Sequence, residues 1–399
     1  MSEVSGGVAR ASGTRLPLPL LLLGFAVFVA VVYELLPIGL LTPIARDFGV
    51  DEQGAGLLVS TFSILVVVGS IPLSAVTARF DARITLAVVL VTFFLSAGIM
   101  AFTTSFGVAL VARALGGVAH AVLFTAVYRI ALSVVAPERR AVAATTVSAG
   151  NAMALALGVP LATALANLAS WRLPFAVVAA VFALLAIAVF ALLPKTRTET
   201  GEALTTRLVL RAAVQPGLLR VAVTIVVVLL AHFLTYTYVE PLLRGAGVPE
   251  QGVVFVLFGY GIACVVGLLA VTRFTHAHPA AALRVTLVFV LAVVIAIGLT
   301  RDSSWGVTIA VIAWGVGFGA MPVLLNVLAI RASLRLPAVA APVSNTAFNI
   351  GITLGAIAGG QAITVTGTGG LGFISAGVLL LIVIVILIPR WLPRDGHLD

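Results

Sequence analysis

The feature that most constrains this chain is a recurring pattern of apolar segments, each close to bilayer-spanning length. A transmembrane helix needs about 20 consecutive apolar residues, so each of these segments is long enough to cross a membrane. The expected spans are residues 18–44, 54–77, 83–102, 106–133, 139–167, 172–193, 217–243, 250–272, 280–299, 304–330, 338–365 and 370–390. The sequence therefore predicts an all-α polytopic membrane protein with twelve transmembrane helices.

The scarcity of charge supports the same fold class. Charged residues make up 9% of the chain, against about 25% in a soluble domain. Too few charges remain to cover a water-facing surface, so the surplus apolar surface must face lipid. The formal net charge of +9 sits mostly in short loops, which favours a topological role over nucleic-acid binding. The single cysteine, Cys264, excludes an intramolecular disulfide and is expected as a small core residue.

The basic residues predict how the chain is oriented. Short cytoplasmic loops carry an excess of Lys and Arg. With the N-terminus inside, the outer face keeps only Arg46, Arg172, Arg244 and Arg301. The cytoplasmic face then collects Arg10, Arg15, Arg79, Arg83, Arg129, Arg139, Arg140, Lys195, Arg197, Arg207, Arg211, Arg220, Arg273, Arg284, Arg331, Arg335, Arg390 and Arg394. This partition predicts that both termini are cytoplasmic.

The chain also repeats itself at an offset of 198 residues. Residues 43–54 align without a gap with residues 241–252, and seven of those twelve positions are identical. Residues 194–217 form the longest polar stretch, so we expect an N-terminal six-helix half (1–193), a cytoplasmic linker (194–217) and a C-terminal six-helix half (218–399). Duplicated halves are typical of secondary transporters, which bind substrate between the repeats near the membrane midplane.

Glu34 is the most conspicuous polar residue of the predicted spans. An ionisable side chain in hydrocarbon costs at least about 2.5–3.5 kcal/mol and marks a candidate functional site. Glu34 precedes Arg46 by twelve residues, which places it roughly 18 Å below the outer interface. It is either a structural residue bonded to a neighbouring helix or a carboxyl that loads and releases a proton near neutral pH.

His232 occupies the repeat-equivalent position of Glu34, because 34 plus 198 is 232. His232, Tyr236 and Glu240 are spaced by four residues and share one helix face. Such a polar stripe faces the protein interior, so these residues are candidates for lining a central cavity. A satisfied core histidine remains the alternative for His232. Glu240 lies four residues before Arg244, so an interfacial role is equally open for it.

Arg113 and His120 are seven residues apart and therefore share a face, with Phe124 one turn further on. Arg113 keeps its charge and must find an acceptor inside the bundle. It is either a fixed structural group or a partner that tunes Glu34 or holds a ligand. Asn151 and Asn349, which the repeat aligns, bind substrate or act as interhelical hydrogen-bond glue.

Several segments together resemble a known family. They are residues 34–41, 113–124, 158–161, 236–241 and 348–351. With these segments the chain resembles the major facilitator superfamily, in particular its twelve-helix drug:proton antiporters. Within that group it looks most like the sugar-efflux exporters and the related chloramphenicol and purine-nucleoside exporters. The resemblance covers nearly the whole chain.

The resemblance implies roles for individual residues. It implies proton coupling through Glu34 and Arg113, and an antiporter signature at Gly158 and Pro160. Here Val159 separates that glycine from the proline, whereas the family has them adjacent. Residues 77–83, Thr-Ala-Arg-Phe-Asp-Ala-Arg, also lack the acidic residue and the glycine of the family's cytoplasmic gate.

Together these observations predict a proton-coupled antiporter that exports a sugar, a nucleoside or a drug such as chloramphenicol. The expected setting is the bacterial plasma membrane, as a monomer that needs no cofactor and no metal. The expected substrate-binding residues are His120, Phe124, His232, Tyr236, Tyr238, Glu240 and Asn349. A facilitator or proton symporter that imports a similar solute is the first alternative. An intramembrane enzyme is the second, and the chain lacks the His-Glu-x-x-His and Gly-x-Ser-x-Gly patterns that would favour it.

Overall fold

The computed structural model describes residues 18–136, 139–196, 206–272, 278–333, 339–388 and 391–393, apart from the side chains of residues 141, 144, 206–208, 210 and 341. Every regular element in these ranges is a helix, and 12 helices are long and apolar enough to cross a membrane. The predicted all-α polytopic fold is thus confirmed. Some predicted cytoplasmic groups lie outside the described residues: Arg10, Arg15, Arg197, Arg273, Arg335, Arg390, Arg394 and the side chain of Arg207.

The helices follow one another along the chain as an N-terminal series, a short connecting helix and a C-terminal series. The N-terminal series is α1 (Leu18–Leu35), the 3₁₀ helix η1 (Leu36–Leu40), α2 (Leu41–Phe48), α3 (Glu52–Thr77), α4 (Ala82–Phe102), α5 (Phe106–Ser133), α6 (Arg140–Ala166) and α7 (Arg172–Leu192). The connecting helix is α8 (Thr206–Ala213), which lies within the stretch predicted as a polar linker. The C-terminal series is α9 (Pro216–Tyr236), α10 (Val239–Gly245), α11 (Glu250–Thr272), α12 (Pro279–Leu299), α13 (Ser304–Ala332), α14 (Ala340–Thr366), the 3₁₀ helix η4 (Thr368–Gly370) and α15 (Leu371–Leu387).

Two spans that the sequence predicts as single helices are broken. The first divides into α1, η1 and α2, and the seventh divides into α9 and α10. A proline has no N–H, so the carbonyl four residues before it loses its helical partner. Pro43 and Pro241, which the repeat aligns, are each the third residue of the short helix after the break. Pro37 adds a second interruption inside η1.

The helix boundaries repeat at the offset found in the sequence. The first residues of α1, α2, α3 and α5 are 18, 41, 52 and 106, and adding 198 to each gives the first residues of α9, α10, α11 and α13. The remaining pairs, α4 with α12, α6 with α14 and α7 with α15, agree with this offset to within two residues. The two series therefore share one helical plan.

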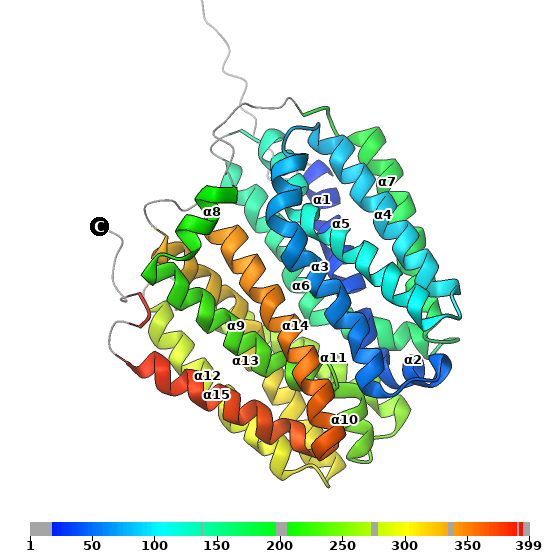
Figure 1. The fold of residues 1–399 in the computed structure, drawn as a ribbon, viewed down its shortest axis with the longest axis vertical. Helices are drawn as coiled ribbons and strands as arrows, with labels where there is room; N and C mark the ends of the chain where they lie inside the picture. Colours follow the sequence, from blue (N-terminus) through cyan, green and yellow to red (C-terminus); the bar gives the residue numbers. More distant parts are fainter. Residues whose placement is uncertain are drawn as a thin grey trace, which may run out of the picture.

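Figure 1 shows the two series as adjoining bundles, α1–α7 coloured blue to green and α9–α15 coloured green to red. The bundles pack against each other through α3 with α14 and through α6 with α11. We call the end that carries α2 and α10 the distal end, and the opposite end, near α8, the linker end (Figure 1). Cys264 on α11 is buried, as predicted for a small core residue.

Candidate functional site

The break in the first span is held by Arg113 from α5. Pro37 leaves the carbonyl of Tyr33 without its helical partner. Arg113 is fully buried, and its Nη1 and Nη2 donate to the carbonyl oxygens of Tyr33 (2.9 Å) and Glu34 (2.8 Å). Its Nε donates to the carbonyl of Leu58 on α3 (3.0 Å). The acceptors that this arginine needs are thus backbone carbonyls, two at the helix break and one on α3.

Glu34 lies beside this break with its carboxylate turned toward α5. The residue is 7% exposed, and its Oε2 lies 3.7 Å from Nε2 of His120. The hydrogen bonds of the Arg113 guanidinium go to backbone carbonyls, so the carboxylate faces a histidine in apolar surroundings. The ring of Phe124 lies 5.6 Å from the ring of His120. Four predicted site residues of the N-terminal bundle therefore meet at one place.

His232 is buried in the C-terminal bundle and faces the protein interior, as the polar stripe on its helix predicts. Its ring stacks on Phe318 of α13, with 3.7 Å between centroids and an interplanar angle of 8°. Tyr236, one turn along α9, lies 4.9 Å from the His232 ring. The sequence reasoning did not single out Phe318 or its neighbour Trp314, whose ring is 4.5 Å from His232. The repeat could have identified Phe318, because this residue is the equivalent of His120 at the offset of 198.

Tyr238 lies apart from the rings around His232, at the distal junction between the bundles. Its hydroxyl donates to the carbonyl oxygen of Ala356 on α14 (2.8 Å). A Cβ added at Gly56 of α3 would collide with the Tyr238 hydroxyl, and one added at Gly360 of α14 would lie 2.7 Å from it. The absence of side chains at these glycines allows the tyrosine ring to fit between α3 and α14.

Glu240 also lies at this distal junction. One of its carboxylate oxygens accepts a hydrogen bond from the backbone N–H of Thr42 (3.0 Å), at the start of α2 in the other bundle. The other oxygen lies 3.8 Å from Nε of Arg244. Free N–H groups in the first turn of a helix attract a carboxylate. Thr42 and Glu240 are 198 residues apart, so this contact joins repeat-equivalent positions of the two bundles.

The remaining predicted residues lie on α6 and α14. Asn349 is buried, and its Nδ2 donates to the carbonyl of Asn345 (3.0 Å). Asn151 is half-buried on α6. Gly158 lies against Val32 of α1, and Pro160 lies close to Gly261 of α11, where the bundles meet. α6 therefore packs against α1 on one side and the C-terminal bundle on another.

A largely apolar cavity opens at the linker-end halves of α1 and α6. Its volume is about 680 Å³. It is lined by Leu21, Gly24, Phe25, Phe28, Val142, Thr145, Thr146, Ala149, Gly150 and Met153. Gly24 and Gly150 lie in contact and let the two helices approach closely. Phe28 precedes Glu34 by six residues, roughly 9 Å along the helix, so the cavity lies on the linker side of the acid.

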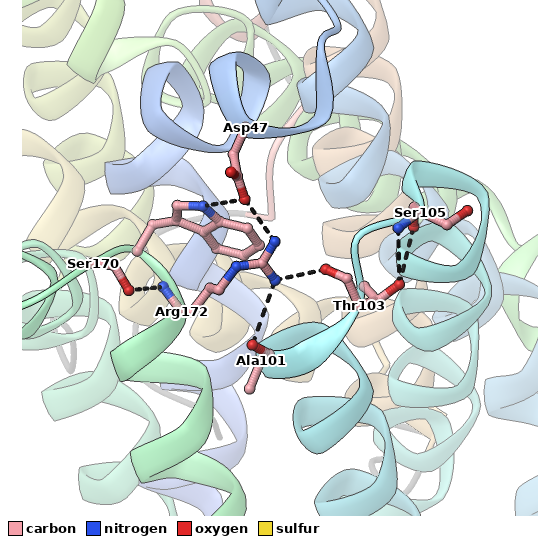
Figure 2. Close-up of polar contacts among 7 residues, drawn as sticks. Asp47, Ala101, Thr103, Ser105, Ser170 and Arg172 are labelled. Carbon is pink, nitrogen blue, oxygen red and sulfur yellow. Dashed lines mark hydrogen bonds and ion pairs between the residues drawn. The ribbon is translucent and has the colours of Figure 1, made fainter.

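At the distal end of the N-terminal bundle, Arg172 joins three segments. Figure 2 shows its guanidinium between the carboxylate of Asp47, at 2.6 Å, and the carbonyl oxygens of Thr103 (2.6 Å) and Ala101 (3.4 Å). The indole N–H of Trp171 donates to the same carboxylate (3.1 Å). This network fixes α2 to the ends of α4 and α7. Trp171 and Ala101 are buried while Asp47 is exposed, which suits a structural contact better than a binding site.

The loop between α3 and α4 is held by its own contacts at the linker end. Asp81 caps α4 by accepting from the backbone N–H of Arg83 (2.7 Å), and its carboxylate also accepts from the Thr196 hydroxyl (3.2 Å). Burial acts to raise the pKa of Asp81, but these hydrogen bonds outweigh it and hold the pKa below its ordinary value. Arg129 donates to the carbonyls of Thr77, the last residue of α3, and of Phe80 in the loop that follows. No group of three metal-ligating side chains occurs among the described residues.

Two solved structures with the same architecture are transporters. A mutant of the nucleoside transporter NupG superposes with a TM-score of 0.70 at 16% identity, covering 93% of this chain and 98% of its own. A bacterial homologue of the human lysosomal transporter Spinster, in an inward-facing and unoccupied conformation, gives a TM-score of 0.64 at 16% identity, with 93% of each chain covered. At these identities the likeness establishes the fold.

Sequence relatives of known name agree with the fold. A chloramphenicol efflux pump of Mycobacterium tuberculosis is 31% identical over 366 residues, which is 89% of this chain and 88% of the relative. A protein named "Probable sugar efflux transporter" of Helicobacter acinonychis is 25% identical over 349 residues, 87% of this chain and 89% of the relative. The profile of the Major Facilitator Superfamily matches residues 21–341. The chain therefore belongs to the Major Facilitator Superfamily and is a multi-pass membrane transporter of small molecules, not an enzyme.

Proposed function

We propose that this transporter is a proton-coupled antiporter that exports a small molecule, a sugar, a nucleoside or a drug such as chloramphenicol. One observation carries the proposal. The carboxylate of Glu34 is buried at a helix break, 3.7 Å from His120, while the nearby Arg113 is engaged by backbone carbonyls. An ionisable group kept in the membrane interior at such a cost is expected to act in transport.

Arg113 supports this role without forming a fixed ion pair with the acid. A carboxylate locked in a hydrogen-bonded pair with a guanidinium would be held in one protonation state. The guanidinium instead stabilises the broken backbone, which leaves the Glu34 carboxyl free to take up a proton on one side and release it on the other. Moving one charge across 100 mV is worth about 2.3 kcal/mol, enough for roughly fifty-fold accumulation of substrate.

The two ends of the molecule support alternating access between the bundles. At the distal end, the contacts of Glu240 with Thr42 and of Tyr238 with Gly56 join the bundles. The cavity between α1 and α6 lies on the linker side of Glu34. In our proposal substrate enters from the linker side, and separation of the distal contacts then opens the site to the opposite side.

The distribution of basic residues supports the membrane orientation that we propose, and the names of the relatives support the proposed direction of transport. The basic residues gather at the linker end, so we propose that this end, both termini and the linker 194–217 are cytoplasmic in a bacterial plasma membrane. In this arrangement the chain works as a monomer of two six-helix halves, 1–193 and 218–399. The relatives are named for efflux of sugars and of chloramphenicol, which favours export over import. A cysteine placed at Gly201, which lies outside the described residues, should label only from the cytoplasm.

The decisive experiment measures transport in vesicles with an imposed pH gradient. Wild-type protein should concentrate substrate against its gradient in exchange for protons. Glu34→Gln keeps the side-chain volume but cannot titrate, so it should lose uphill transport and keep counterflow exchange without a pH gradient. Uphill transport by Glu34→Gln would contradict the proposal. Substrate that follows the proton gradient in the same direction would instead identify an importer.

A further inference from the structure

Five aromatic rings gather in the C-terminal bundle at the depth of His232, and we call them the aromatic cluster. They are His232 and Tyr236 of α9, Tyr260 of α11, and Trp314 and Phe318 of α13. Beyond the stack of His232 on Phe318, the rings of Tyr236 and Tyr260 stack with 4.9 Å between centroids. All five side chains are buried. Three helices thus meet through rings.

The aromatic cluster contains polar atoms without partners. Both ring nitrogens of His232, the hydroxyl of Tyr236 and the indole N–H of Trp314 are buried and have no hydrogen-bond partner among the described residues. A buried donor or acceptor left unpaired costs roughly 1–3 kcal/mol. If these three rings served only for packing, phenylalanine or leucine would fill the same space without the free-energy cost of four unpaired polar atoms.

The aromatic cluster of the N-terminal bundle has the opposite character. There the ring of Tyr33 is surrounded edge-on by Phe62, Phe93 and Phe182, at 5.8–6.0 Å between centroids. Its hydroxyl is hydrogen-bonded to Ser96 (2.5 Å). The Tyr33 hydroxyl is therefore paired, whereas His120, whose ring lies edge-on to Phe62, has one ring nitrogen without a partner in the described part of the chain. The C-terminal cluster differs because several unpaired polar atoms lie together on neighbouring rings.

The helices around the aromatic cluster limit the charge of anything bound there. α9, α11 and α13 carry Asp, Glu, Lys or Arg only near their ends, at Arg220, Glu250 and Arg331. Each of these lies at least ten residues from the cluster residues of its helix, or about 15 Å along the axis. A charged group bound among the rings would have no counter-charge on these helices and would be costly to desolvate.

We propose that the aromatic cluster binds an uncharged ring of the transported solute. One face of the solute ring stacks on the aromatic side chains, and its hydroxyl, carbonyl or amide groups pair with His232, Tyr236 and Trp314. Stacking and a few convergent hydrogen bonds are the usual means of recognising such ligands. This inference rests on the proposed export function and names the substrate class. It assigns the solute ring to the C-terminal bundle and leaves the proton to Glu34.

The test is equilibrium binding to purified full-length protein in detergent. The probes are chloramphenicol, isopropyl thiogalactoside and uridine as three neutral rings, with glucuronate as a charged ring. Trp314→Phe keeps a ring and removes one hydrogen-bond donor, so it should weaken binding of a neutral ring roughly tenfold. Tyr236→Phe should do the same, and serves if Trp314→Phe does not fold. Trp305→Phe is the matched control, because that indole is exposed at the start of α13.

The outcomes separate this inference from the export function. Weaker binding in both cluster variants, with Trp305→Phe unchanged, supports the site, and the probe that binds names the kind of ring. Wild-type affinity in Trp314→Phe and Tyr236→Phe would overturn it. It would also be overturned if the wild-type protein bound none of the three neutral rings, or if it bound glucuronate as tightly as a neutral ring. Glu34→Gln should still bind the ring, so loss of coupling and loss of the ring site appear in different assays.

Discussion

The two bundles share one helical plan and differ in chemistry at corresponding positions. Glu34 and His120 form a 3.7 Å contact between an acid and an imidazole, whereas their repeat equivalents, His232 and Phe318, form a ring stack. Arg113 corresponds to Val311, which is also fully buried. The two bundles thus share their backbone plan, while the side chains at these corresponding positions differ. The N-terminal bundle carries Glu34, Arg113 and His120 there, and the C-terminal bundle carries His232, Val311 and Phe318.

The largest loss of stability is expected at the break in the first span. Arg113→Ala should destabilise the protein by about 3 kcal/mol or more, since it strands several buried carbonyls that each cost roughly 1–3 kcal/mol. Val311→Ala, at the equivalent position, removes only methyl groups and should lower the thermal unfolding midpoint less. Thermal unfolding in detergent with size-exclusion chromatography measures both. Equal midpoints for the two variants would show that the bundles do not differ in this way.

The acid and its repeat equivalent should separate coupling from affinity. Glu34→Gln removes a titrating group, so the substrate ratio reached under a pH gradient should fall at least about tenfold. His232→Gln should leave that ratio unchanged at saturating substrate and raise the substrate concentration needed for half-maximal rate. The measurement is export at several substrate concentrations with and without the gradient. If His232→Gln abolishes the gradient-driven ratio, the division between the bundles is wrong.

The distal junction should respond to a single methyl group. A Cβ at Gly56 would collide with the Tyr238 hydroxyl, and overpacking of this kind typically costs about 1–3 kcal/mol. Gly56→Ala should therefore weaken closure and increase labelling of a cysteine at Thr42 from outside the cell severalfold. Gly98→Ala is the control, because a Cβ there meets nothing within 4 Å. Identical labelling in the two backgrounds would remove the junction from the proposed gate.

The smallest effect on stability is expected at the linker end, where the corresponding helices α4 and α12 begin in different ways. α4 is capped by Asp81, whereas α12 begins with Pro279. Because the folded-state pKa of Asp81 is lowered, its charge stabilises the fold above the unfolded-state pKa, and this contribution is lost as the pH falls through the folded value. Asp81→Asn should cost about 1 kcal/mol or less at pH 7. The difference in unfolding midpoint from wild type should shrink toward pH 3, and a difference that grows would contradict this sign.

The fold class, the ends of the membrane spans and the repeat follow from the amino-acid sequence alone, whereas the breaks in the first and seventh spans do not. Apolar length and charge scarcity leave little choice, because backbone groups in lipid must be satisfied within helices. The predicted and observed spans therefore agree to within a few residues. The same repeat makes His232 the equivalent of Glu34, and the buried position of both follows from the cost of exposing them to lipid.

The contacts of each polar side chain, by contrast, depend on how the helices pack against one another. The sequence offered Arg113 as a partner for the Glu34 carboxylate. Its guanidinium instead binds backbone carbonyls at the break in the first span, one of which Pro37 leaves free. Tyr238 and Glu240 share a segment with His232, yet the second helix break directs them to the distal junction. Trp314 and Tyr260 give no signal in sequence, because a ring in an apolar helix looks the same whether it faces lipid, core or a neighbouring histidine. Contacts between helices depend on rotation and crossing, which one-dimensional spacing does not contain.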